Sequence, residues 1–422
     1  MASKKKPNPN QRQAVAPPLR AELAATPLGG GFGRDLANWL FPVYLLMIIA
    51  GFLAIWKYGS PAGNPNGVRA LFLAMNSATL SGFTEGSGVG GLNHFGQWIA
   101  FLLVIGGSLF TMIVGGLAVI RIVRLPFSDA DLIWSALAVE GTVLLVGTSV
   151  LWDMDRSPFQ AMFLAGSSFG NCGQYVANLP KPSNFPVHAV ILPLSILGGL
   201  GLPVLMELWC AITFRAKLST HSKTVVSASA WLYVIGLVLI LALNLNSGST
   251  WLDVRGQLSV SSVFSVQSRT GGLAIGAVKD LTPPAQWILV VLMLIGASSA
   301  GTGSGLKTTT IAELARGTRK LLRGESAGRS FGIAVAWLSI YLGLLLGAVL
   351  LLSHISANDP AENILFDAVS AMSNVGFTSS PIADEKGVMF AYCAIILVGR
   401  MAPLMVLWWM AETTPDAELA IG

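Results

Sequence analysis

Long, continuous apolar runs recur along most of the chain, separated by shorter polar segments. Runs at 38–56, 225–243 and 331–352 approach or exceed the roughly 20 residues that a helix needs to cross a bilayer. Apolar residues follow one another within these runs and do not alternate with polar ones, so the pattern predicts helices and not a β-barrel. The pattern therefore predicts an all-α protein that crosses a membrane several times.

Four shorter windows share a second pattern, in which a helix-like stretch of apolar and small residues breaks at a polar or small residue followed by a glycine. The windows are LFLAMNSATLSGFT from Leu71, MFLAGSSFGNCGQY from Met162, SSVFSVQSRTGGLA from Ser261 and LFDAVSAMSNVGFT from Leu365. Their aligned glycines, Gly82, Gly173, Gly272 and Gly376, are spaced 91, 99 and 104 residues apart. A nearly constant period of this length indicates internal duplication.

Each window lies between two longer apolar segments, which predicts a repeating unit of span, pore loop and span. We expect eight transmembrane helices and four re-entrant half-helices around a pseudo-fourfold pore. The expected spans are 38–56, 95–120, 131–152, 187–213, 225–246, 284–315, 331–353 and 388–411. The expected parts of the chain are a cytoplasmic tail (1–37) and four repeats (38–125, 126–220, 221–328 and 329–422, the last with a C-terminal tail).

Composition supports a membrane protein and charge gives its orientation. The chain is 53% hydrophobic and 11% charged, whereas soluble proteins carry about 25% charged residues. Its net charge of +5 does not indicate nucleic-acid binding, because the basic residues fall in short loops between spans. Sixteen of the 26 lie in the N-terminal tail and the loops on its side, and eight lie on the other side. The positive-inside rule then predicts a cytoplasmic N-terminus and half-helices that enter from outside.

The repeated windows have the chemistry of an ion pathway. A half-helix that enters from outside points its C-terminus, with about half a negative charge, toward the middle of the membrane. The loop after it can turn carbonyl oxygens toward an axis, as a dehydrated cation requires, and glycine permits the positive φ that such a turn needs. A single window could equally be an ordinary glycine-capped helix. Four in register on the same side favour a selectivity filter.

Three sequence segments extend this pattern to a known family. They are Arg269-Thr270-Gly271-Gly272, ASSAGTGSGLKTTT at 297–310, and Gly399-Arg400. With the fourfold repeat over about 38–412, they resemble the Trk/Ktr/HKT superfamily of potassium transporters. The chain looks most like the bacterial Ktr membrane subunit, because no extra pair of spans stands before the first repeat. A Trk-type subunit and a sodium-permeable member of the family are the alternatives.

The resemblance implies which residues would form the filter, the gate and the support of the filter. The filter would consist of Thr79, Leu80, Ser81 and Gly82; Asn171, Cys172 and Gly173; Thr270, Gly271 and Gly272; and Asn374, Val375 and Gly376. The gate would consist of Ala297, Ser298, Ser299, Ala300, Gly301, Thr302, Gly303, Ser304, Gly305, Lys307 and Arg400. Arg269 would brace the third loop, which we expect it to do through a carboxylate.

The residues around the expected gate carry a physical argument of their own. WILVVLMLIG (287–296) covers only half a bilayer, and three glycines interrupt the small-residue segment 297–305 that follows it. Interrupted spans indicate a transport site, although composition alone would also permit a simple hinge. Arg400 lies near the middle of the last span, where a charge is costly unless it faces protein, water or a partner, and such a residue indicates a function. The alternative is an arginine that binds carbonyls and locks helices together.

The resemblance also implies what the protein transports and with what it assembles. It implies potassium uptake with a dependence on sodium, no covalently bound cofactor, a homodimer, and a separate cytoplasmic ring-forming subunit that binds nucleotides. We expect a multi-pass protein of the bacterial cytoplasmic (inner) membrane, in contact with lipid. A secondary transporter of another fold and a membrane-embedded enzyme are the competing classes. No set of paired Asp or Ser/His residues appears within the spans, so we expect no enzyme.

Overall fold

The computed structural model describes the chain with gaps. Described are residues 32–59, 66–84, 86–152, 157–245, 251–269, 271–380, 382, 385–413 and 417–422, although the side chains of 32–37 and 251–253 are not. The expected cytoplasmic tail lies almost wholly outside these ranges. Residues 32–37, expected to belong to that tail, already form the first turns of α2.

The first half of the chain contains two long helix pairs, each with a short helix beside it. Its elements are α2 (Phe32–Ala54), the π-helix η2 (Ile55–Gly59), α3 (Gly67–Thr79), the 3₁₀ turn η3 (Gly88–Gly91), α4 (His94–Val123), α5 (Asp129–Trp152), α6 (Pro158–Gly170), the π-helix η4 (Val187–Ile191), α7 (Leu192–Leu200) and α8 (Leu202–Phe214).

The second half follows the same order. Its elements are α9 (Thr220–Asn244), α10 (Trp251–Gln267), the 3₁₀ turn η5 (Val278–Asp280), α11 (Pro283–Leu294), α12 (Thr308–Leu322), α13 (Gly328–Ile355), α14 (Ala361–Met372) and α15 (Lys386–Thr413). In the described part of the chain, the β-structure is a single isolated bridge between Ile295 and Leu306. The expectation of an all-α fold is therefore confirmed.

Among the described residues, six helices are long and apolar enough to cross a membrane, and the bent pair formed by Val187–Leu200 and α8 would make a seventh. In α4 and α15, 78% and 56% of the apolar window is buried, whereas α2 with η2, α5, α9 and α13 bury only 17–28% of theirs. Helices α4 and α15 are thus central. The others expose large apolar side chains such as Trp39, Leu145 and Trp231, an outer surface suited to lipid.

Short-range capping explains where two of the short helices begin. The Asn66 side chain accepts from the backbone N–H groups of Val68 and Arg69 at the start of α3. Ser157 and Gln160 form a reciprocal capping box at the start of α6, with Pro158 in the first turn. Such caps satisfy N–H groups that have no partner within the helix.

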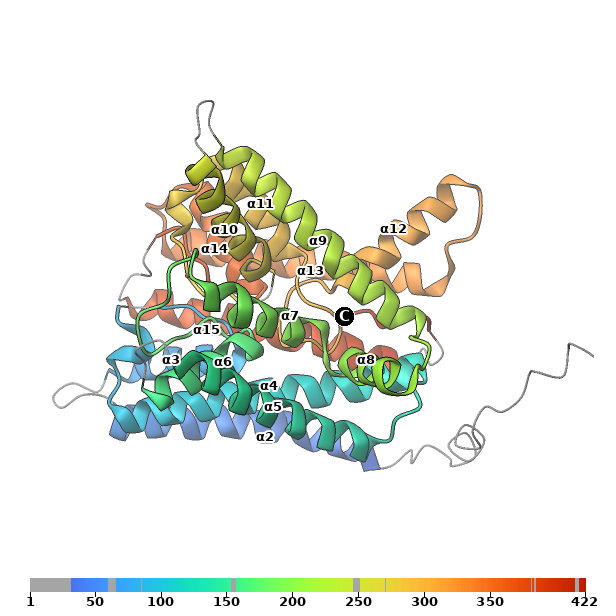
Figure 1. Ribbon diagram of the computed structural model, residues 1–422, viewed down its shortest axis with the longest axis horizontal. Helices are drawn as coiled ribbons and strands as arrows, with labels where there is room; N and C mark the ends of the chain where they lie inside the picture. Colours follow the sequence, from blue (N-terminus) through green and yellow to red (C-terminus); the bar gives the residue numbers. More distant parts are fainter. Residues whose placement is uncertain are drawn as a thin grey trace, which may run out of the picture.

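The short helices α3, α6, α10 and α14 gather toward the left of Figure 1, whereas α8 and α12 lie toward the right.

One expected span is not straight. The segment 187–213 breaks at Gly201, and its two halves are bent by 104°. Gly201 has φ of +86°, which favours glycine. A β-carbon there would lie 2.9 Å from backbone atoms of Ser299, Ala300 and Gly301. The bend therefore depends on close contact with the segment 297–305, which we call the small-residue loop.

Candidate functional site

Four glycine-containing loops follow the short helices, and their described residues share features of backbone conformation. We call residues 79–82, 171–173, 270–272 and 374–376 loops one to four. Gly82, Gly173, Gly272 and Gly376 all have positive φ, between +55° and +98°. Two residues before the glycine, Leu80, Asn171 and Asn374 are left-handed as well, while Thr270, the residue at this place in loop three, lies outside the described residues. The duplication seen in the sequence is thus matched by a duplicated backbone geometry.

The four loops meet in a closed cycle. The carbonyl oxygen before each glycine lies against the glycine of a neighbouring loop, as the positions of added β-carbons show. A β-carbon on Gly82 would lie 2.6 Å from the Cys172 oxygen, and one on Gly173 would lie 2.7 Å from the Gly271 oxygen. A β-carbon added to Gly272 would overlap the Val375 oxygen, and one added to Gly376 would overlap the Ser81 oxygen.

The order of contact is therefore loop one, two, three, four and back to one. Each loop contributes the equivalent carbonyl, that of Ser81, Cys172, Gly271 or Val375. Because α3, α6, α10 and α14 end at these loops, the negative ends of four helix dipoles also converge there. The arrangement can surround a cation with backbone oxygens without using a carboxylate.

Polar side chains within the short helices hold the loops. Phe83 N donates to Asn76 Oδ1 at 3.1 Å, and Ser167 Oγ donates to the Gln174 carbonyl at 2.6 Å. The equivalent bonds in the later repeats are Leu273 N to Gln267 Oε1 at 3.2 Å and Gly376 N to Ser370 Oγ at 3.1 Å. We did not predict these residues, although each lies five or six positions before its glycine, where a polar residue interrupts an apolar helix.

Neighbouring loops are also joined through side chains. The Asn374 amide donates to Ser81 Oγ at 2.7 Å, which links loop four to loop one. Ser77 Oγ donates to Gln174 Oε1 at 2.7 Å, which links the helix before loop one to the residue after loop two. Buried hydrogen bonds of this kind fix the relative positions of the carbonyls.

The small-residue loop is buried and hydrogen-bonded on several sides. Ser298 N and Thr302 N donate to the carbonyls of Gly199 and Gly198, both at 3.0 Å. Thr302 Oγ1 accepts from the Asn171 amide at 2.8 Å, which places the loop directly against loop two. Ser304 Oγ donates to the carbonyl of Gly399 at 2.6 Å. The segment is therefore held between α7, loop two and α15, and it is not a solvated hinge.

Arg400, which is 2% exposed, joins loop one to the small-residue loop. Its Nε donates to the Thr79 carbonyl at 2.8 Å, and its Nη1 donates to the Thr302 carbonyl at 2.6 Å. Its Nη2 bonds the Thr79 carbonyl and, at 3.4 Å, that of Leu80. Lys307, also 2% exposed, donates from Nζ to the carbonyl of Gly303 at 2.7 Å. Two buried cationic side chains thus bind the backbone around one short loop.

The C-terminal residues 417–422, which we call the tail segment, contact the small-residue loop and were not predicted to do so. The Ala420 carbonyl accepts from Ser299 Oγ at 2.7 Å and from Thr309 Oγ1 at 2.6 Å. The Gly422 carbonyl accepts from Lys307 N at 3.1 Å. Ala420 and Ile421 are fully buried. These contacts join positions more than 100 residues apart, so no local sequence signal announces them.

Arg269 has a different environment from the one we expected. Its Nη1 donates to the Ser229 carbonyl of α9 at 3.4 Å, and its Nε has no partner in the described part of the chain. Among the described residues no carboxylate pairs with it, and the brace of loop three by Arg269 stays a prediction. No group of His, Cys, Asp or Glu in the described part of the chain could hold a metal ion.

Comparison with known proteins shows relatives of one kind. No family model matches the chain. It is 28% identical over 273 residues to "Ktr system potassium uptake protein B" of Vibrio alginolyticus, a match that covers 61% of this chain and 60% of that protein. It is 26% identical over 430 residues to the protein of the same name from Bacillus subtilis, covering 90% and 95% of the two chains.

Two further similarities agree with these. "Potassium/sodium uptake protein NtpJ" of Enterococcus hirae is 25% identical over 418 residues, covering 89% of this chain and 92% of that protein. The crystal structure of the potassium transporter TrkH from Vibrio parahaemolyticus superposes with a TM-score of 0.68 and 15% identity, covering 90% of this chain and 85% of TrkH. That structure shows a shared fold. The relatives are named as ion-uptake proteins and not enzymes, so the expectation of no enzymatic activity is confirmed. The resemblance found in the repeated loops thus extends over most of the chain, which is similar to proteins named as Ktr system potassium uptake proteins.

Proposed function

We propose that this protein carries potassium across the bacterial cytoplasmic membrane through the cycle formed by loops one to four. The observation that carries the proposal is the equivalent carbonyl that each loop contributes next to a neighbour's glycine. Four such oxygens can replace the hydration shell of a cation. The names of the relatives favour potassium as the ion, and that of NtpJ brings in sodium as well.

The proposal includes a membrane topology. Helices α2, α4, α5, α9, α13 and α15 each span the bilayer, and the broken pairs α7–α8 and α11–α12 complete eight spans. The short helices α3, α6, α10 and α14 enter from outside, and the N-terminus is cytoplasmic, as the distribution of basic residues favours. The protein works as a homodimer with a nucleotide-binding regulatory subunit on its cytoplasmic side.

The gate consists of the small-residue loop with Lys307 and Arg400. Because Thr302 touches loop two and Arg400 bonds loop one, the gate lies next to the ion pathway at the C-terminal ends of the short helices. Opening requires that these bonds break or move. We expect a deletion of 298–304 to raise basal potassium flux.

Rubidium uptake in a host that lacks its own potassium uptake systems tests the function, with and without sodium. Saturable uptake that restores growth at low potassium supports the proposal, and stimulation by sodium supports sodium dependence. Uptake that needs an opposing ion gradient, or no uptake by a correctly inserted protein, would favour a secondary transporter of another substrate.

The tail segment should restrain the gate. Replacement of Ile421 by aspartate places an unpaired charge in a fully buried site, which expels the tail segment and removes the acceptors of Ser299 and Thr309. We expect basal rubidium flux to rise several-fold at equal expression. The matched control is Glu418→Gln in the same segment, because its exposed ion pair with Arg316 contributes little. Equal flux in parent and Ile421→Asp would mean that the tail segment does not restrain the gate.

A further inference from the structure

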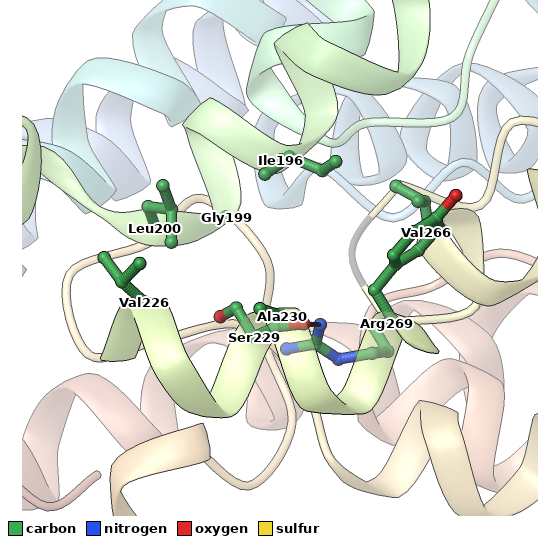
Figure 2. A pocket seen from close by; sticks show the side chains of 9 residues that line it. Ile196, Gly199, Leu200, Val226, Ser229, Ala230, Val266 and Arg269 are labelled. Atoms are coloured by element: carbon green, nitrogen blue, oxygen red, sulfur yellow. Dashed lines mark hydrogen bonds between the residues drawn. The ribbon is translucent and has the colours of Figure 1, made fainter. Parts of the chain in front are cut away.

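A cavity of about 290 Å³ lies between α7, α9 and the end of α10. Gly199 and Leu200 in its wall bond to Ser298 of the small-residue loop, and Arg269 directly precedes loop three. Its walls are mainly apolar and include Ile196, Leu200 and Val226. Figure 2 shows the side chain of Arg269 reaching from the end of α10 to Ser229 of α9, across from Ile196 and Leu200 of α7. The cavity opens toward the outer surface of the helices, where Ala230 is exposed and Ile196 is 39% exposed.

No described residue compensates the charge of Arg269 in this cavity. The residue is 7% exposed, its one bond to a described residue is the 3.4 Å contact with Ser229, and its buried Nε has no partner among those residues. A buried guanidinium at membrane depth is costly unless it meets an anion or several acceptors. The described residues supply neither. The cavity therefore has the charge and the apolar walls that an anionic amphiphile would complete.

The depth of the Arg269 guanidinium and the volume of the cavity determine which kind of amphiphile can bind. Ser229 is nine residues from the start of α9, which places the guanidinium about 14 Å along the helix from that end. A phosphodiester headgroup stays charged and therefore stays at the interface. A carboxylic acid can enter in its neutral form and ionise beside an arginine. A volume of about 290 Å³ is at the lower end for ligand pockets, and it suits a small head and the start of one chain.

We propose that a long-chain fatty acid occupies this cavity from the bilayer, with its carboxylate on Arg269 and its first methylenes against Ile196, Leu200 and Val226. The guanidinium donates to the carboxylate oxygens, including through the Nε that has no protein partner. The rest of the acyl chain lies in the lipid along α9. The ligand thus supplies the acceptor that the described residues do not.

The site is coupled to the proposed gate through its own wall. The carbonyls of Gly198 and Gly199 bind Thr302 N and Ser298 N of the small-residue loop, and Leu200 O accepts from Ser298 Oγ. Arg269 also lies two residues before Gly271 in loop three. A ligand that binds the cavity in its present shape stabilises the conformation in which these hydrogen bonds hold the small-residue loop. Resting on the proposed function, this coupling predicts that fatty acid slows ion flux.

Binding is tested first, on the purified full-length protein in lipid nanodiscs, with a photoactivatable palmitate. We expect cross-links to map to α7 and α9 at the cavity and unlabelled palmitate to compete, while hexadecanol does not. Ala230→Trp closes the mouth from an exposed position and should abolish the cross-links. Ala242→Trp, exposed on the same helix away from the cavity, should keep them. Arg269→Gln should weaken binding by about tenfold or more, and Arg269→Lys by less, because the bond to the carboxylate is charge-assisted.

Several outcomes would overturn the proposal. Equal competition by phosphatidylglycerol or by hexadecanol would reject a fatty-acid carboxylate as the ligand. Cross-links that survive in Ala230→Trp would place the ligand elsewhere. A change of oligomeric state in Ala230→Trp, with no palmitate bound by the parent, would mean that a second copy of the chain covers the cavity.

Flux is measured separately, in liposomes with and without palmitate. We expect slower rubidium flux in the parent and in Ala242→Trp, and no effect in Ala230→Trp. If no flux occurs at all, the proposed function fails while the binding result still decides the ligand. If flux occurs and palmitate binds but leaves it unchanged, the coupling through Gly198–Leu200 is rejected.

Discussion

Replacement of Gly82 by serine is expected to let sodium compete with potassium during uptake, and the same change at Gly272 is expected to abolish uptake. Both glycines have positive φ, so any side chain costs on the order of 1 kcal/mol in backbone strain alone. The two positions differ in how closely a side chain would approach a backbone oxygen of the neighbouring loop. At Gly82 an added β-carbon would lie 2.6 Å from the Cys172 oxygen, whereas at Gly272 it would overlap the Val375 oxygen.

The same comparison ranks all four positions. Gly173 resembles Gly82, with 2.7 Å to the Gly271 oxygen, and Gly376 resembles Gly272, with an overlap at the Ser81 oxygen. The atom displaced is in each case a carbonyl of the proposed filter, which cannot rotate away as a flexible side chain could. An irregular and wetter ring favours sodium, which holds its hydration shell more tightly than potassium does. We therefore expect a larger defect at Gly272 and Gly376 than at Gly82 and Gly173.

Competitive uptake of rubidium and sodium at matched expression measures this ranking. The matched controls are Gly141→Ser and Gly343→Ser, because a β-carbon at either glycine meets no atom within 4 Å. Both lie outside the loops, in the long helices α5 and α13. They therefore also control for the effect of placing a serine in a proposed membrane span. If all four loop variants keep the ion ratio of the parent, these glycines do not line the ion pathway.

The sequence predicted the repeated elements well because their signals are local. Helices α3, α6 and α14 end within two residues of a left-handed residue, and α10 ends four residues before Gly271, so each break falls within a single window. The interruption after residue 294 was visible for the same reason, since glycines and small residues replace a run of large apolar ones. The positive φ of the aligned glycines agrees with the reason for choosing them.

The bend at Gly201 was missed because hydropathy does not register it. The segment around it is apolar throughout, and the local signals, Gly201 and Pro203, are also common inside membrane helices. What fixes the bend is contact with Ser299, Ala300 and Gly301, about 100 residues later. The tail segment was missed for the same physical reason. Contacts between distant parts of the chain leave no periodic trace in either part.

The partners of Arg400 could not be read from its position either. A mid-membrane arginine indicates a function or a lock between helices, and the structure combines elements of both. Its hydrogen bonds to Thr79 and Thr302 tie loop one to the small-residue loop, while its charge stays close to the proposed ion pathway. These two contributions can be separated by substitution.

Arg400→Ala is expected to raise basal potassium flux roughly tenfold or more. A unit charge acting over about 10 Å at an effective dielectric of about 20 contributes about 1.7 kcal/mol to a barrier, which is more than a factor of ten in rate. Loss of the bonds to Thr79 and Thr302 acts in the same direction, because it frees the small-residue loop. The unpaired carbonyls also cost about 1–3 kcal/mol each unless water reaches them, so expression must be matched.

Arg400→Lys distinguishes the charge from the bridge. Lysine keeps the positive charge, but its compact ammonium cannot reproduce the planar fork that reaches the Thr79 and Thr302 carbonyls together. If the electrostatic barrier dominates, flux through Arg400→Lys stays near that of the parent; if the bridge dominates, it rises toward that of Arg400→Ala. Rubidium efflux from loaded liposomes, measured without any regulatory subunit, separates these results. Parent-like flux in both variants at normal expression would remove Arg400 from the gate and leave it only the role of locking α15 to loop one.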